Sequence, residues 1–249
     1  MIKAVTFDFW DTLVADDSDE PRRQALGLPT KAQARLQLLV DEIMLYYPTV
    51  QPEQIAEAFT HANEQFRQAW KVDFHTPTVA KRLRGVYDFL HVGLTPGFQE
   101  IARKVEEMEV IIPPSFVPGA REVLAELAGL YALGIVSDTI HTSGRGIRTL
   151  LENQGLLQYF RSFVFSDEVG ASKPQAVVFE RAASQLGVPL SQTVHVGDRE
   201  SNDVDGPLAV GMKAILFTGL VDRGGAKTRA NAICREFAKL PDVIRELDP

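Results

Sequence analysis

Cysteine and long apolar runs are scarce in this chain, and each shortage excludes a class of protein. Cys234 is the one cysteine among 249 residues, so the chain has no internal disulfide and no cysteine-based zinc site. No stretch reaches about 18 uncharged apolar residues, and the first fourteen residues do not form a signal peptide. We therefore expect a soluble protein without a membrane partner, in a reducing cytoplasm.

Basic residues are too few for a nucleic-acid partner. The chain has 26 Lys and Arg against 33 Asp and Glu, and its formal net charge of -7 is spread along the sequence. Binding nucleic acid requires clustered Lys and Arg that neutralise phosphates. Hydrophobic residues make up 45% and charged residues 24%, as in ordinary globular proteins. A small molecule is therefore the expected partner.

The chain is rich in short apolar segments that each lead into a polar or acidic residue. Asp8 follows the first of them, and later segments lead into Ser137-Asp138, Ser166-Asp167 and Gly197-Asp198. Helical patterns separate the later segments, and a final apolar segment covers residues 213–217. This alternation predicts an α/β protein with a doubly wound, Rossmann-like parallel sheet, whose ligands bind at the carboxyl edge of the strands.

A long helical region interrupts this alternation after the first strand. An acidic stretch, residues 15–21, leads out of the strand, and Pro113-Pro114 closes the region. Apolar residues recur at helical spacing between these points, over residues 30–47, 52–70, 78–90 and 97–108. We predict a catalytic core of residues 1–16 and 113–249 with an all-helical insertion of residues 17–112. Both a monomer and a homodimer remain open.

Three carboxylates are expected at the carboxyl edge of the sheet. Asp8 ends the first strand, Asp198 ends a later one, and Asp203 follows five residues on. Their charges would repel one another unless a hard divalent cation lay among them, and ligation by oxygen alone suits Mg²⁺. The sequence therefore predicts a magnesium site.

The same edge offers groups that bind an anion. Lys173 precedes a predicted helix start, and Ser137 ends a predicted strand, so together they present an ammonium group and a hydroxyl. Asp8 is the candidate nucleophile. Attack by Asp8 on a phosphoryl group, giving an aspartyl-phosphate, would use all of these parts.

The motifs and their order resemble those of the haloacid dehalogenase superfamily of hydrolases, in the branch with a helical cap domain inserted after the first motif. Asp8 to Thr12 resembles the first motif, Ser137 the second, Lys173 the third, and Gly197-Asp198 with Asn202-Asp203 the fourth. The segment 116–120 resembles the return from the cap to the core.

The resemblance implies a role for each matching residue. Asp8 would be the nucleophile, Ser137 and Lys173 would bind the transferred group, and Asp138 would lie beside the substrate. Asp8, Asp198 and Asp203 would supply carboxylates to Mg²⁺, with the backbone carbonyl of Trp10 as a further ligand. The expected function is a Mg²⁺-dependent phosphatase of a small phosphorylated metabolite.

Trp10 departs from the family pattern, because phosphatases of the family carry an aspartate there as general acid and base. An aromatic residue at this position is typical of metal-independent 2-haloacid dehalogenases, whereas the Gly197-Asp198 pair is typical of metal-binding phosphatases. A dehalogenase and a non-catalytic metabolite-binding protein remain alternatives. A phosphonate-cleaving enzyme would need a cap lysine, and no motif selects among Lys31, Lys71 and Lys81.

Three further residues carry competing interpretations. Asp11 either replaces the missing acid or caps the turn after the first strand, and the second interpretation is favoured. Asp138 stands where the family often has asparagine, and its side chain either opposes a bound phosphate or accepts hydrogen bonds from the backbone. His195 lies within an apolar strand, where we expect a packed ring with a bonded nitrogen.

Overall fold

The central element is a six-stranded parallel sheet with the strand order β3-β2-β1-β4-β5-β6. The computed structural model describes residues 1–247. Its strands are β1 (Ala4–Phe7), β2 (Ala132–Ser137), β3 (Phe160–Phe165), β4 (Thr193–Gly197), β5 (Lys213–Phe217) and β6 (Ala232–Cys234). All four residues of β1 are buried, as expected for a strand covered on both faces. The predicted doubly wound α/β fold is confirmed.

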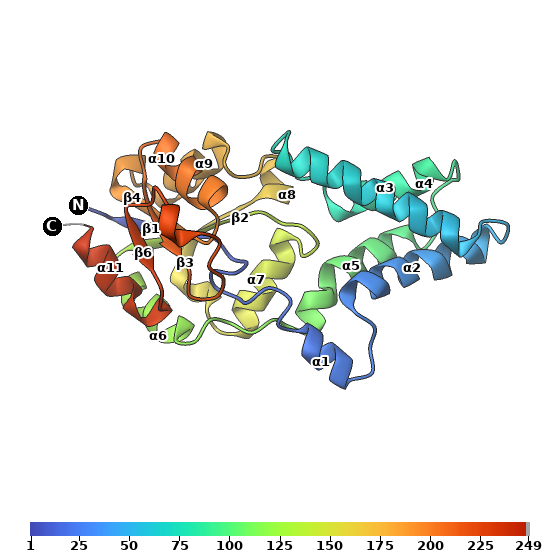
Figure 1. Ribbon diagram of the computed structural model, residues 1–249, viewed down its shortest axis with the longest axis horizontal. Helices are drawn as coiled ribbons and strands as arrows, with labels where there is room; N and C mark the ends of the chain where they lie inside the picture. The colour runs from blue at the N-terminus through green and yellow to red at the C-terminus, as the bar shows by residue number, and fades with distance from the viewer. Residues whose placement is uncertain (248–249) are drawn as a thin grey trace.

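Helices cover both faces of the sheet (Figure 1). On one face lie α6 (Ala120–Ala128), α7 (Gly144–Asn153) and α11 (Leu240–Glu246), which share an apolar core with β1 and β2. On the other face lie α9 (Ala176–Leu186) and the short α10 (Gly206–Ala209), and Phe179 of α9 packs against Val136 and Val164. The one-turn helix α8 (Ser166–Val169) follows β3.

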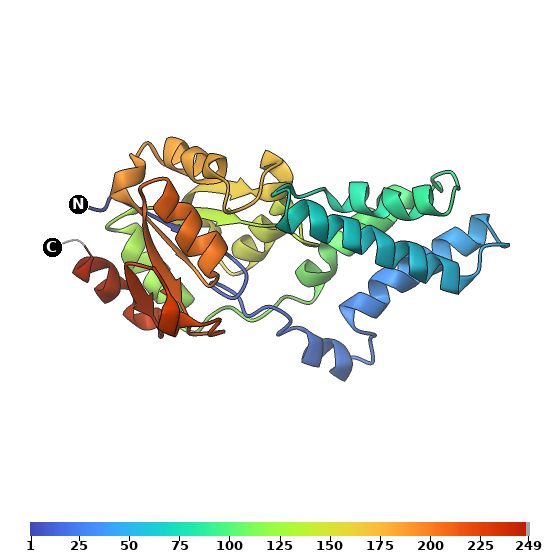
Figure 2. The same ribbon diagram turned by 45° about the horizontal axis from the view of Figure 1, so that its top comes forward.

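A separate helical unit extends beyond the carboxyl edge of the sheet (Figures 1 and 2). It consists of α1 (Glu20–Ala25), α2 (Lys31–Tyr46), α3 (Pro52–Lys71), α4 (Val79–Phe89) and α5 (Phe98–Ile111). The unit has its own apolar core, which includes Leu39, Ile55 and Tyr87. A capping box at Thr30, Pro52 in the first turn of α3 and the Thr78 hydroxyl start three of these helices.

The chain enters and leaves the helical unit at one place. The Ala15 N–H donates to the Ser115 carbonyl (2.9 Å), and Val14 forms a β-bridge with Phe116. Close by, the Lys31 ammonium contacts the carboxylates of Asp19 (2.7 Å) and Glu109 (2.8 Å). Burial alone lowers the pKa of Lys31, but Glu109 and Asp19 outweigh burial and raise it above its ordinary value.

Two parts of the architecture differ from the sequence-based expectation. The acidic stretch, residues 15–21, is not only a linker, because α1 begins within it at Glu20, where Pro21 in the first turn favours a helix start. The helical pattern expected between the segment that leads into Gly197-Asp198 and the segment 213–217 is a π-helical segment, Glu200–Asp205, followed by α10. Within residues 1–247, we find no helix that combines the length and the apolar character needed to span a membrane.

Candidate active site

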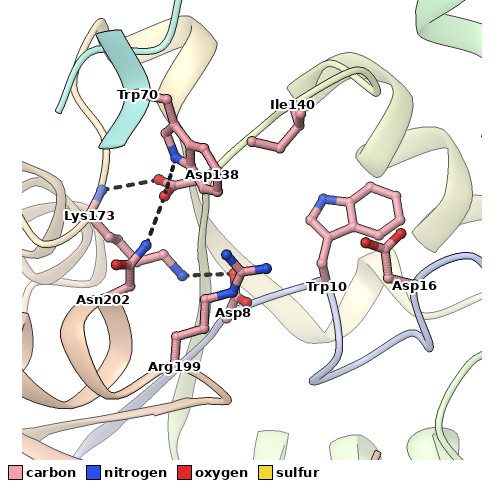
Figure 3. Close-up of a pocket in the computed structure, with 9 residues that line it drawn as sticks. All are labelled: Asp8, Trp10, Asp16, Trp70, Asp138, Ile140, Lys173, Arg199 and Asn202. Carbon is pink, nitrogen blue, oxygen red and sulfur yellow. Dashed lines mark hydrogen bonds and ion pairs between the residues drawn. The ribbon is translucent and has the colours of Figure 1, made fainter. Parts of the chain in front are cut away.

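Asp8 lies at the carboxyl end of β1, at the centre of the sheet. Its backbone N–H donates to the Val196 carbonyl of β4 (2.9 Å), which continues the strand pairing up to the carboxylate. The side chain is mostly buried and borders a small cavity of about 50 Å³ (Figure 3). The indole of Trp10 lines the same cavity. An aromatic side chain therefore stands at the position where the resemblance implies a general acid.

Lys173 is the cation nearest to Asp8. Its ammonium nitrogen lies 2.7 Å from Asp8 Oδ1 and 2.6 Å from Asp203 Oδ1. Burial alone lowers the pKa of Lys173, but Asp203 and Asp8 outweigh burial and raise it, so the ammonium stays charged. A buried cation between two carboxylates can fix the orientation of the Asp8 carboxylate.

Asp203 is bonded from several sides. It accepts hydrogen bonds from Lys173 at 2.6 Å and from the Arg199 N–H at 3.0 Å. The His195 ring lies 3.1 Å from Asp203 and 2.9 Å from the Thr6 hydroxyl. Burial alone raises the pKa of Asp203, but Lys173 and His195 outweigh burial and lower the pKa below its ordinary value, so the carboxyl stays ionised. His195 is therefore a packed ring with both nitrogens bonded, as expected, and burial lowers its pKa despite Asp203.

The carboxylates are arranged as a cation site requires. One oxygen from each of Asp8, Asp198 and Asp203 lies within 4.8 Å of the others. Asp198 Oδ1 is buried and has no hydrogen-bond partner among residues 1–247, so it is free to accept a ligand. Arg223 binds the other oxygen of Asp198. This donor set fits a hard divalent cation, with Asp203 already taken up by its protein partners.

Ser137 and Asp138 end β2 beside this site. Ser137 is buried, and its hydroxyl lies 3.4 Å from the Asp138 carbonyl oxygen. The side chain of Asp138 lines the cavity and accepts the Lys173 N–H at Oδ1 (3.0 Å). This hydrogen bond from a backbone donor agrees with the second of the two interpretations of Asp138. Burial raises the pKa of Asp138 to about 6.

Asp11 lies outside the cavity lining and has both oxygens bonded. Oδ1 accepts the Asp16 N–H (3.0 Å), and Oδ2 lies 2.7 Å from the Arg223 guanidinium. Asp11 adopts a left-handed backbone conformation with φ of 54°, which aspartate tolerates in turns. These contacts support the turn-capping interpretation.

Several residues that line the cavity were not expected from the sequence. Trp70, Arg199 and Asn202 border it, as does Asp16 beside the Trp10 indole (Figure 3). Burial, together with the charges of Asp17 and Glu109, raises the pKa of Asp16 to about 6. Asn202 belongs to the fourth motif, but no motif marks the other three positions. Trp70 ends the expected helical range 52–70, and only its hydrogen bond to Asp138 at the end of β2 reveals its place.

A buried aspartate, a lysine paired with it and a carboxylate cluster at one sheet edge match the motifs of a known hydrolase family. The family model described as haloacid dehalogenase-like hydrolase matches residues 2–211. The chain belongs to this family.

Two similar proteins are named as phosphatases, and a solved structure shares the fold. The glyceraldehyde 3-phosphate phosphatase of Methanopyrus kandleri is 28% identical over 86% of this chain and 83% of that protein. The enzyme of the same name from Pyrococcus abyssi is 30% identical over 53% of this chain, and the match spans only 55% of that relative. A 2-haloacid dehalogenase from Pseudomonas syringae has a TM-score of 0.72 at 23% identity, over 99% of this chain and 100% of its own.

Proposed function

We propose that this hydrolase is a Mg²⁺-dependent phosphatase of a small phosphorylated metabolite, acting through an aspartyl-phosphate on Asp8. The observation that carries the proposal is the arrangement of Asp8 at 2.7 Å from the buried Lys173 ammonium, within a cluster of three carboxylates. Phosphatase activity in the named relatives supports the same chemistry. The single buried cysteine is compatible with the reducing cytoplasm in which we propose the protein works.

The residues have distinct roles in this proposal. An Asp8 oxygen attacks phosphorus, the bond to the leaving oxygen breaks, and that oxygen takes the electron pair. Water then attacks the phosphorus, which releases inorganic phosphate and regenerates the Asp8 carboxylate. Lys173 and Ser137 bind phosphoryl oxygens, and Asp138 borders the substrate.

Asp8, Asp198 and the Trp10 carbonyl would hold Mg²⁺, with Asp203 completing the carboxylate set. The cation would neutralise charge on the transferred group. The helical unit, residues 17–112, would serve as the cap domain that closes over the substrate and excludes water.

Trp10 restricts the leaving groups that this mechanism can expel. A general acid accelerates departure of a poor leaving group by roughly 10² to 10⁴. Trp10 offers no carboxyl at the family position, so acyl and aryl phosphates should be hydrolysed faster than alkyl phosphates. Equal or slower hydrolysis of acetyl phosphate would contradict this part of the proposal.

The first test is phosphate release from p-nitrophenyl phosphate and acetyl phosphate, with Mg²⁺ or with EDTA. We expect turnover that requires Mg²⁺ and that Asp8→Asn abolishes. Asp205→Asn is the matched control, because Asp205 is an acidic residue near Asp203 that pairs with the exposed Arg229 instead. Turnover that persists in Asp8→Asn would exclude the aspartyl-phosphate.

A metal-independent 2-haloacid dehalogenase is the second candidate, favoured by the aromatic side chain of Trp10 beside Asp8. Halide release from 2-haloacids in the presence of EDTA would support it. Tight binding of a metabolite without any turnover would instead support a non-catalytic binding protein.

A further inference from the structure

Trp70 brings the helical unit into contact with the reaction site. It lies at the end of α3, and its indole borders the cavity that Asp8 and Trp10 line (Figure 3). A group that leaves in line with Asp8 moves away from β1, toward the helical unit. Trp70 is therefore placed where the leaving group of a substrate would lie.

Asp138 fixes the orientation of this indole. The Trp70 Nε1–H donates to Asp138 Oδ2 (3.0 Å), and the Asn202 amide donates to the same oxygen (3.2 Å). The Lys173 N–H donates to the other oxygen (3.0 Å). Three donors from three segments thus converge on one carboxylate. An ionised carboxylate accepts hydrogen bonds and donates none, so it can receive all three. This pattern suits a structural junction better than a site for an anionic phosphate.

The backbone around Trp70 is held by contacts that do not use the indole N–H. Ser172 N–H donates to the Phe74 carbonyl (2.9 Å), and the Ser172 hydroxyl donates to the Trp70 carbonyl (3.4 Å). The Arg199 guanidinium lies 5.7 Å from the centre of the Trp70 ring. A substitution that removes only the indole N–H should therefore free the ring while the segment stays docked.

We propose that Asp138 is a positioning residue that holds Trp70 as the wall limiting the size of the leaving group. This proposal rests on the phosphatase function proposed above. The cavity of about 50 Å³ is small, since roughly 10–15 Å³ by the same measure holds one water. It shares Trp70 with a hollow of about 410 Å³ on the side of the helical unit, and Trp10 with another of about 240 Å³. A leaving group that extends past Trp70 toward the larger hollow must displace the indole and break its bond to Asp138, whereas a small one leaves both in place.

The test compares 1-naphthyl phosphate with acetyl phosphate in the intact enzyme with Mg²⁺. Trp70→Phe keeps a ring but loses the N–H, and Asp138→Asn keeps the size but loses the charge. Each variant should raise the ratio of kcat/KM for naphthyl over acetyl phosphate by about tenfold to a hundredfold, the range of one hydrogen bond to a charged group. Asp73→Asn, at an exposed acid of the same segment, is the control and should leave the ratio unchanged.

The double variant tests whether the two residues act together. Because both substitutions break the same bond, the double variant should change the ratio no more than the stronger single variant. Effects that multiply, or an unchanged ratio in either single variant, would overturn the proposal.

A second measurement separates this proposal from the proposed function. If the wild type hydrolyses no phosphate, the phosphatase function fails, and the limit on leaving groups fails with it. The positioning role of Asp138 is then decided by hydrogen exchange of the Trp70 indole N–H, assigned through Trp70→Phe. Protection in the wild type that is lost in Asp138→Asn upholds that role, and equal exchange in both overturns it.

Discussion

Arg223 lies between two carboxylates, and one of them belongs to Asp11 of the first motif. Its guanidinium bonds Asp198 and also lies 2.7 Å from Asp11 Oδ2. The Asp11 carboxylate thus meets a cation from the loop after β5. The contact joins the turn after β1 to the end of β4, and it leaves one Asp198 oxygen without a protein partner.

These contacts predict that Asp11 does not transfer protons in catalysis. Asp11→Asn should change kcat for an alkyl phosphate by less than about threefold, since loss of a general acid costs roughly 10² to 10⁴. Steady-state phosphate release checks this expectation, and Asp17→Asn provides an exposed acidic control on the same segment. A loss of a hundredfold or more would assign the acid role to Asp11.

At the scale of elements, the entry and exit of the helical unit depend on one buried lysine. Lys31 begins α2 and contacts Asp19, from the segment before α1, and Glu109 of α5. Asp19 is completely buried, and Glu109 is nearly so. Burying these charges is tolerated only while each has a partner of opposite sign.

Lys31→Met should therefore destabilise the protein strongly. Removing the ammonium takes away the cation that contacts the buried Asp19 and leaves Glu109 with the Arg35 guanidinium, at 3.5 Å, and the expected loss in the free energy of unfolding is about 3–5 kcal/mol. Urea unfolding followed by circular dichroism measures the loss. Lys104→Met is the matched control, because Lys104 is half-exposed and lies 3.9 Å from Glu100, and a loss below about 1 kcal/mol is expected there. Equal losses in both variants would contradict the role given to Lys31.

At the scale of the whole molecule, the sheet was readable from the sequence because buried parallel strands are continuous apolar runs. The expected segment 213–217 coincides with β5, and Ser137, which was expected to end a strand, is the last residue of β2. The edge strand β6 was missed because Ala232–Cys234 is too short to form a recognisable run. The short α1 was hidden by its acidic surroundings.

The candidate site was only partly readable for a related reason. Asp8 and Asp198 could be placed because each directly follows a strand, and parallel strands bring their ends to one edge. The bond between Trp70 and Asp138 joins residues 68 positions apart, and that between Arg223 and Asp11 joins residues 212 apart. Such contacts depend on how a helical unit and a loop pack against the sheet, which no local pattern encodes.

Cys234 offers a probe of folding across the whole molecule. Its thiol is buried in β6, and burial raises its pKa to about 11. Near pH 8 only about 0.1% would be thiolate, so the native protein should resist a disulfide reagent such as DTNB. Labelling should rise with urea in parallel with the loss of circular dichroism. Rapid labelling of the native protein would instead show that the β6 edge opens independently.

The chain enters and leaves the helical unit at neighbouring positions, and this has an evolutionary consequence. Because Ala15 and Ser115 are hydrogen-bonded to each other at 2.9 Å, a turn of a few residues could replace everything between them. The sheet and its carboxylates would not need to move. Recombination could therefore exchange the helical unit as a cassette, so that new substrate preferences arise while the chemistry is inherited intact.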